Sequence, residues 1–201
     1  MTSAELEDAD RRLTWLYMIG GAIGLIAAVV LLIEKVALLE DPTYVPSCSI
    51  NPILSCGSIM RTSQAEAFGF PNPLIGVAAF PVVVTTGVAM VAGAAFRRWY
   101  WRGLLTGTVA GLVFVHWLIF QSLYRIGALC PYCMVVWVVT IPLFLYTALH
   151  LAQSSPALER SRFTPIVRLA TTYHGVILTI WYLAIAGLIA RRFWNYWSTL
   201  L

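Results

Sequence analysis

Five long segments of this 201-residue sequence hold almost no charged side chains, and this pattern limits what the chain can fold into. The hydrocarbon core of a membrane is roughly 30 Å thick, so a helix needs about 20 apolar residues to cross it. Backbone groups in lipid must also be satisfied within their own segment, which favours helices. We therefore predict one all-α membrane domain, residues 1–201, whose five transmembrane helices cover about residues 13–36, 74–96, 103–124, 129–152 and 169–190.

The composition excludes several classes of soluble protein. Hydrophobic residues make up 60% of the chain, charged residues make up only 11%, and the mean hydropathy is +0.80. A soluble domain carries about a quarter charged residues, so a nucleic-acid-binding protein, a disordered chain and a soluble enzyme are excluded. The first segment is also too long for a signal peptide, has acidic residues in its flank and lacks a small-residue cleavage site.

The distribution of Lys and Arg predicts the orientation. A cytoplasmic N-terminus places eight basic residues in the cytoplasm: Arg11, Arg12, Arg97, Arg98, Arg102, Arg160, Arg162 and Arg168. Five lie on the other side: Lys35, Arg61, Arg125, Arg191 and Arg192. This bias follows the positive-inside rule, although Arg191 and Arg192 oppose it and leave open the alternative that residues 171–190 do not cross. We expect a multi-pass protein of the plasma (inner) membrane with a cytoplasmic N-terminus.

Glycines recur at four-residue spacing in two of the segments. Gly20 and Gly24 share a face of the first helix, and Gly103, Gly107 and Gly111 share a face of the third. One interpretation is a groove for a ligand. The favoured interpretation is close packing between helices, because small residues let the backbones of membrane helices approach each other.

All four cysteines fall in two connectors on the same side of the membrane. Cys48 and Cys56 belong to the long connector 40–73, and Cys130 and Cys133 open the fourth segment. The connectors after the first and third spans share a face, and the charge bias makes it the non-cytoplasmic one, where disulfides persist. Long loops of this kind are often functional, so we predict that residues 40–73 form a redox loop.

The motif Cys130-Pro131-Tyr132-Cys133 gives its two sulfurs different positions. Proline suits the first helical position, so we expect Cys130 at the helix cap and Cys133 nearly one turn deeper. The N-terminus of a helix stabilises a thiolate. The outer sulfur can then exchange with protein thiols, and the inner one faces the hydrocarbon, where a lipid-soluble oxidant arrives.

Three interpretations of the cysteines compete. They form a redox relay from an external dithiol to a membrane electron acceptor, or a pair of structural disulfides, or a zinc site. Zinc is disfavoured because the seven residues between Cys48 and Cys56 exceed the usual ligand spacing, and we expect no metal. A disulfide within the CxxC motif would close a very small loop and hold nothing together, so the relay is favoured over the disulfide-stapled scaffold.

The chain also resembles a known family in an ordered set of short motifs. After Cys48 and Cys56 come Thr62, then Phe68-Gly69, and then Asn72-Pro73-Leu74-Ile75-Gly76 at the start of the second span. Cys130-Pro131-Tyr132-Cys133 opens the fourth span. In this order and on these spans, the motifs resemble the vitamin K epoxide reductase family in its bacterial, DsbB-like form, over roughly Trp15 to Ala152.

The resemblance implies a four-helix bundle around a quinone of the menaquinone or ubiquinone type, with the fifth helix outside. It implies that Cys133 reduces the quinone, that Cys130 takes the exchange from Cys56, and that Cys48 meets an external partner. That partner is expected to be a separate thioredoxin-like (DsbA-like) protein. The predicted activity is that of a quinone-dependent protein thiol-disulfide oxidoreductase.

Three further residues enter through the resemblance, and two of them have an alternative interpretation. Asn72 matches the residue that hydrogen-bonds a quinone carbonyl, but it also suits a helix cap. Trp137, one turn below Cys133, stands where animal members have a tyrosine that bonds the other carbonyl. Thr62 occupies a position that is Ser or Thr in the family, and it could be a loop hydroxyl without chemistry. His116, in the middle of the third span, is either functional or bonded to a neighbouring helix.

Overall fold

The computed structural model describes residues 11–154 and 164–198, and most of these residues are helical. Five helices are long and apolar enough to cross a membrane: Arg11–Glu40, Pro73–Val91, Arg98–Ile126, Pro131–Gln153 and His174–Arg192. The described residues contain no β-strand, only an isolated bridge between Leu54 and Leu129. The predicted all-α class with five candidate membrane helices is therefore confirmed.

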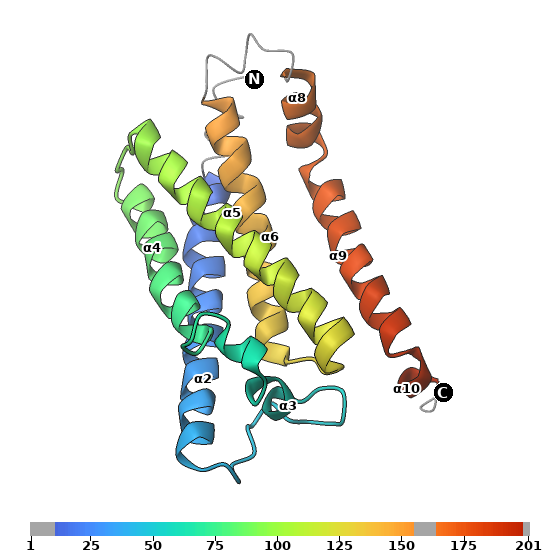
Figure 1. Cartoon of the computed structure of the whole chain (residues 1–201). Helices are drawn as coiled ribbons and strands as arrows, with labels where there is room; N and C mark the ends of the chain where they lie inside the picture. The colour runs from blue at the N-terminus through green and yellow to red at the C-terminus, as the bar shows by residue number, and fades with distance from the viewer. Residues whose placement is uncertain (1–10, 155–163, 199–201) are drawn as a thin grey trace.

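The helices are separated by the connectors that the sequence predicts (Figure 1). In chain order they are η1 (Leu16–Gly20), α2 (Gly21–Glu40), α3 (Cys56–Met60), η2 (Ser63–Glu66), α4 (Pro73–Val91), α5 (Arg98–Phe120), η3 (Gln121–Ile126), α6 (Pro131–Gln153), α8 (Thr164–Thr172), α9 (His174–Arg192) and α10 (Trp194–Trp197). The long connector after α2 and the short one before α6 lie at the same end of the molecule, opposite the turn between α4 and α5.

Several helix boundaries differ from the expected ones: the first long helix extends to Glu40, α9 starts at His174, and both boundaries at the turn between α4 and α5 are shifted. Helix α4 ends at Val91 rather than near residue 96, because Gly93 follows in the left-handed region with φ of 83°. Helix α5 starts at Arg98 rather than near residue 103, so the aromatic residues Trp99, Tyr100 and Trp101 lie in its first turn. Arg160 and Arg162, which contribute to the predicted orientation, lie outside the described residues.

Helices α2, α4, α5 and α6 form the bundle, and α9 lies outside it (Figure 1). Helix α2 packs against α4 and α6, and α5 packs against α6. A Cβ on Gly24 would lie 2.4 Å from the ring of Phe80, so this glycine lets α2 and α4 approach closely. The packing interpretation is thus confirmed for Gly24.

Three side-chain hydrogen bonds attach the peripheral helix α9 to the bundle, one each to α5, α6 and η3. Trp181 Nε1 donates to His116 Nε2 at 2.9 Å, and His116 Nδ1 in turn donates to the carbonyl of Leu112. Tyr182 donates to the carbonyl of Val138 at 2.7 Å, and Arg192 Nε donates to that of Leu123 at 2.7 Å. His116 is therefore bonded to a neighbouring helix, which was one of its two interpretations.

Candidate active site

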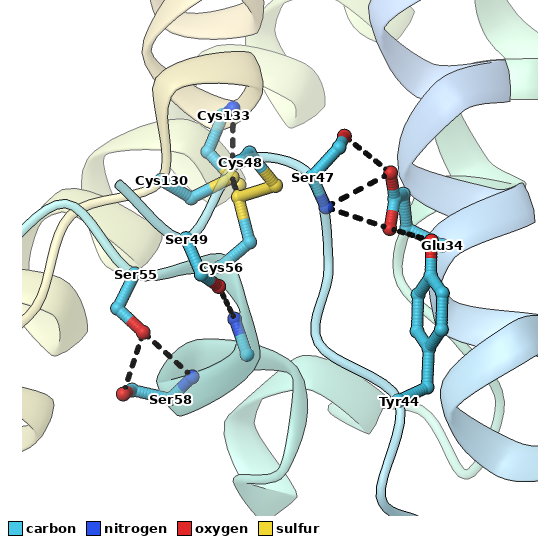
Figure 2. The surroundings of a disulfide bond; sticks show 11 residues. Glu34, Tyr44, Ser47, Cys48, Ser49, Ser55, Cys56, Ser58, Cys130 and Cys133 are labelled. Carbon is cyan, nitrogen blue, oxygen red and sulfur yellow. Dashed lines mark hydrogen bonds between the residues drawn. A yellow bond between two sulfur atoms is a disulfide. The ribbon is translucent and has the colours of Figure 1, made fainter. Parts of the chain in front are cut away.

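Three of the four sulfurs meet in a buried cluster at the end of the bundle. Cys48 and Cys56 form a disulfide, and Cys130 Sγ lies 3.0 Å from Cys56 Sγ (Figure 2). All three sulfur atoms lie within 4.8 Å of one another. The exposed fractions of Cys48, Cys56 and Cys130 are 4%, 0% and 1%. A thiol at this distance from a disulfide sulfur can exchange with it after little movement.

Backbone pairing brings the two cysteine segments together. Ser55 N donates to the carbonyl of Leu129 at 2.9 Å, and Leu129 N donates to the carbonyl of Ile53 at 2.7 Å. Each of these segments runs directly into a cysteine, Cys56 after Ser55 and Cys130 after Leu129. This short parallel pairing therefore places the sulfurs of Cys56 and Cys130 side by side, although 74 residues separate them in the chain.

The CxxC motif opens α6. Cys130 takes the N-cap position with extended backbone, Pro131 is the first helical residue, and Cys130 Sγ accepts a hydrogen bond from Cys133 N at 3.4 Å. Cys130 lies just before the spanning helix, and the hydrogen bond from the Cys133 thiol holds the pKa of Cys130 below its ordinary value, against the opposing effect of burial. The lowered pKa and the contact with Cys56 favour Cys130 as the thiol that exchanges with the loop disulfide.

Two charged residues at the end of α2 hold the redox loop, residues 40–73, in place. Glu34 accepts hydrogen bonds from the Tyr44 hydroxyl at 2.9 Å and from the backbone N–H and hydroxyl of Ser47, which precedes Cys48. Lys35 donates to the carbonyl of Met60 at 2.7 Å and pairs with Glu66 at 2.9 Å. Both side chains are almost fully buried. The hydrogen bonds to Glu34 and the ion pair of Lys35 offset the cost of burying the two charges.

Sequence reasoning missed the role of Glu34 and Lys35. Both stand directly after the uncharged part of the first span and before the long connector, which is a visible but general pattern. Their partners lie 10 to 31 residues further along the chain, so only the folded loop reveals what they bind.

A cavity of about 510 Å³ adjoins the sulfur cluster inside the bundle. Its wall is mostly apolar and includes Cys130, Cys133, Trp137 and Asn72. Trp137 is 3% exposed, and its Nε1 is the only fully buried side-chain nitrogen or oxygen that lacks a hydrogen-bond partner among the described residues. A buried donor without a partner costs about 1–3 kcal/mol, which points to a ligand that accepts its hydrogen bond.

Asn72 lines the cavity, but its amide also forms hydrogen bonds with the backbone of the redox loop. Its Nδ2 donates to the carbonyl of Gln64 at 2.7 Å, and its Oδ1 accepts from Ala67 N at 3.0 Å. The side chain makes no capping bond to α4, so the helix-cap interpretation is wrong. A primary amide has two N–H donors and only one is used by Gln64, which leaves a second donor for a ligand.

Thr62 lies apart from the cavity wall. Its hydroxyl donates to the carbonyl of Ile59 at 2.7 Å, and its carbonyl accepts from Ala65 N at 3.1 Å. It does not belong to the residues that line the cavity. These contacts fold the turn between α3 and η2.

The glycines of α5 do not pack against a neighbouring helix backbone. A Cβ built on Gly103 or Gly107 meets no atom within 4 Å, and one on Gly111 meets only the side chain of Thr140 at 3.5 Å. All three glycines line the cavity. The packing interpretation is therefore wrong for Gly103 and Gly107, which face open space, whereas Gly111 lies in ordinary contact with α6.

The bonding of the four cysteines bears on the three interpretations of them. Cys130 and Cys133 are free thiols rather than a second structural disulfide. The sulfurs of Cys48 and Cys56 are bonded to each other, so they lack the thiolate charge that a zinc ligand needs. A disulfide with a free thiol against it is the arrangement that thiol–disulfide exchange requires.

Comparison with known proteins agrees with this chemistry. The model of the vitamin K epoxide reductase family matches residues 15–148, which include all four cysteines, Asn72 and Trp137. No curated protein matches the chain. The family match covers more than half of the chain and confirms the resemblance seen in the sequence. The chain belongs to the vitamin K epoxide reductase family, and it is a membrane redox protein of the thiol oxidoreductase type.

Proposed function

We propose that this protein oxidises the dithiol of a thioredoxin-like (DsbA-like) protein and delivers the electrons to a quinone in the membrane. The observation that carries the proposal is the 3.0 Å separation between the Sγ of Cys56, in the loop disulfide, and the Sγ of Cys130, beside an apolar cavity. Such a contact transfers a disulfide between the two cysteine pairs without a large rearrangement.

The relay balances as two thiol–disulfide exchanges. A thiolate of the partner attacks Cys48 and breaks the Cys48–Cys56 bond, and the partner's second thiol then releases an oxidised partner. The Cys56 thiolate attacks Cys130 in a Cys130–Cys133 disulfide and frees Cys133. Cys48 resolves the resulting Cys56–Cys130 bond and restores the loop disulfide. The described structure, with a loop disulfide and free Cys130 and Cys133, corresponds to the state at the end of these steps.

The electron acceptor belongs in the cavity beside Cys133. There the thiols of Cys130 and Cys133 would form their disulfide again and give up two electrons and two protons, which a bound quinone would take up to become a quinol. Trp137 supports this assignment because its buried N–H has no partner in the described part of the chain. Asn72 offers a second N–H from the same wall. The largely apolar lining suits a flat ring held by a few polar groups.

Thr62 has a different role in this proposal. Its hydroxyl is bonded to the loop backbone and lies away from the cavity wall. We therefore infer that Thr62 shapes the turn after Cys56 instead of binding the quinone.

The partner reaches the site from the non-cytoplasmic side. The redox loop and the connector before α6 lie at the same end of the molecule (Figure 1). The bias of Lys and Arg supports a cytoplasmic position for the other end of the bundle, where the first long helix begins at Arg11. We assign the protein to the plasma (inner) membrane. Cys48 is 4% exposed in this state, so the segment held by Glu34 must release it before a partner thiolate attacks.

The test uses the full chain in liposomes with a quinone and a reduced thioredoxin-like protein. Loss of partner thiols and formation of quinol are followed together, and the expected ratio is two thiols for each quinol. Cys133→Ala should abolish both changes, and omission of quinone should stop turnover of the wild type. A disulfide-stapled scaffold would give no quinol and no loss of thiols with either protein.

A further inference from the structure

Ser122 is a buried residue of the cavity wall whose hydroxyl has no hydrogen-bond partner among the described residues. It is 4% exposed and lines the cavity from η3, the π-helical turn that continues α5. Its carbonyl accepts from Gly127 N at 2.9 Å, so its backbone is bonded while its side chain is not. Unlike Trp137 Nε1, the hydroxyl is not sealed off completely, because the residue borders the cavity. The cavity is therefore the space from which a partner can reach it.

The local helix geometry explains why this hydroxyl is free. A hydroxyl in a spanning helix commonly bonds to the carbonyl one turn back, as Thr140 does to Val136 at 2.7 Å. The carbonyl one turn before Ser122 belongs to Leu118, and it accepts from the backbone N–H of Gln121 instead. Single π-helical turns occur frequently at functional sites, and this one leaves a buried hydroxyl available to a ligand.

Ser122 lies at the end of the cavity where the sulfurs react. Its neighbour Leu123 packs in one core cluster with Trp137 and Cys133. Cys133, Trp137 and Ser122 all line the cavity. An acceptor ring beside Cys133 therefore lies next to the turn that carries Ser122. The unpartnered N–H of Trp137 independently indicates a ligand with polar atoms in this region.

The two polar groups already assigned to the ring are donors. Trp137 offers only an N–H, and Asn72 offers its second N–H while its Oδ1 accepts from Ala67 N. Both groups suit the carbonyl oxygens of a quinone. Reduction by the two thiols would turn these oxygens into hydroxyl groups, which also need an acceptor. A serine hydroxyl can donate and accept, so Ser122 can bind a ring oxygen before and after reduction.

We propose that the hydroxyl of Ser122 donates to a ring oxygen of the quinone and accepts the hydrogen bond of the O–H that this oxygen carries in the quinol. This inference rests on the proposed quinone site and adds a residue to it. Without Ser122, the quinone loses one donor, whereas the quinol keeps a buried O–H without an acceptor, which costs more. Ser122 therefore stabilises the quinol more than the quinone, and a bound quinone is easier to reduce.

The test measures the equilibrium affinities of duroquinone and its quinol for the full chain in lipid nanodiscs without oxygen. Both ligands are titrated against Cys133→Ala, because this variant cannot pass electrons to the quinone. Adding Ser122→Ala should weaken quinone binding by roughly threefold and quinol binding by roughly tenfold or more, since only the quinol is left with an unsatisfied O–H. Ser122→Thr keeps the hydroxyl and should restore the ratio of the two affinities found with serine.

Thr140→Val is the matched control. It removes a hydroxyl from the same cavity wall, but this hydroxyl is already bonded to the carbonyl of Val136. The ratio of the two affinities should therefore stay unchanged. Gln121, which also lines the cavity, is only half-buried, so Gln121→Met should change the ratio less than Ser122→Ala does.

The outcomes separate this inference from the proposed function. Equal losses for quinone and quinol in Ser122→Ala, or no loss, would overturn the role of Ser122 while quinone-dependent thiol oxidation stands. A change of the ratio in Gln121→Met but not in Ser122→Ala would assign the acceptor to Gln121 and would also overturn it. Failure of both ligands to bind the chain with Ser122 intact would overturn the proposed quinone site itself.

Discussion

Trp137→Phe tests the acceptor site selectively, because it keeps an aromatic ring in the cavity wall and removes only the N–H donor. A neutral hydrogen bond contributes about 0.5–1.5 kcal/mol net, which corresponds to roughly a 2- to 13-fold change in affinity. Trp137 is 3% exposed, so water cannot easily replace the lost donor. We therefore expect the KM for quinone to rise by about five- to tenfold, near the upper end of this range.

The same substitution should affect stability in a different way. Without quinone, the indole N–H is a buried donor with no partner among the described side chains, and removing it relieves a cost of about 1–3 kcal/mol. The smaller ring also loses contacts with Ile119 and Leu123, which pack around Trp137. These effects oppose each other, so the melting temperature without quinone should change little. A tenfold weaker affinity should, however, lower the stabilisation by saturating quinone by about 1.4 kcal/mol.

The assay combines quinol formation at varied quinone concentration with thermal unfolding in the presence and absence of quinone. Trp181→Phe is the matched control, because its Nε1 donates to His116 at the contact with α9. That variant should loosen the outer helix and leave the KM for quinone at its wild-type value. If Trp137→Phe also leaves the KM and the quinone-induced stabilisation unchanged, the Trp137 N–H does not bind the quinone. The indole then contributes only van der Waals packing to the cavity wall.

Two further predictions concern the redox loop. Asn72→Ala should raise the KM for quinone a few-fold and also speed hydrogen exchange at Ala67, whose N–H it binds; unchanged exchange would contradict the observed role of the amide in the loop. Lys35→Met should increase alkylation of reduced Cys56 by roughly ten- to a hundredfold, because the loop loses a charge-assisted bond worth about 1.5–3 kcal/mol. Glu66→Gln should have a smaller effect, since Glu66 is 38% exposed, and an equal or larger effect would show that the ion pair, rather than the bond to Met60, holds the loop.

The long apolar segments were sufficient to predict the fold class, because a spanning helix needs little information beyond length and composition. The position of Cys130 at the cap of α6 likewise followed from Pro131, whose backbone suits the first helical position. These features depend on residues that are neighbours in the chain, so their physical causes are visible in the sequence.

The glycine face of α5 could not be predicted in the same way. Four-residue spacing places Gly103, Gly107 and Gly111 on one face, but it does not say whether a helix or an open space lies opposite. The same spacing marks a close contact at Gly24, where Phe80 is packed against the backbone. The difference arises from the positions of the neighbouring helices, which the spacing alone does not contain.

The hydrogen-bond partners of the polar side chains could not be predicted from the sequence either. Asn72 was expected to contact a quinone or cap a helix, and in the fold its amide holds Gln64 and Ala67 of the redox loop. Glu34 was not singled out at all, although it holds the segment before Cys48. Such bonds depend on how an irregular loop folds back on a helix end, and neither periodicity nor motif spacing specifies that path.

The central claim is that electrons pass between the two cysteine pairs through Cys56 and Cys130. The most direct measurement is peptide mapping of the disulfides in Cys133→Ala after rapid alkylation of free thiols in acid. The account predicts a Cys56–Cys130 bridge with Cys48 alkylated, because the sulfur that would resolve this bridge is missing, whereas Cys130→Ala should show only the Cys48–Cys56 bond. A dominant Cys48–Cys130 bridge, or no bridge between the loop and α6, would contradict the relay.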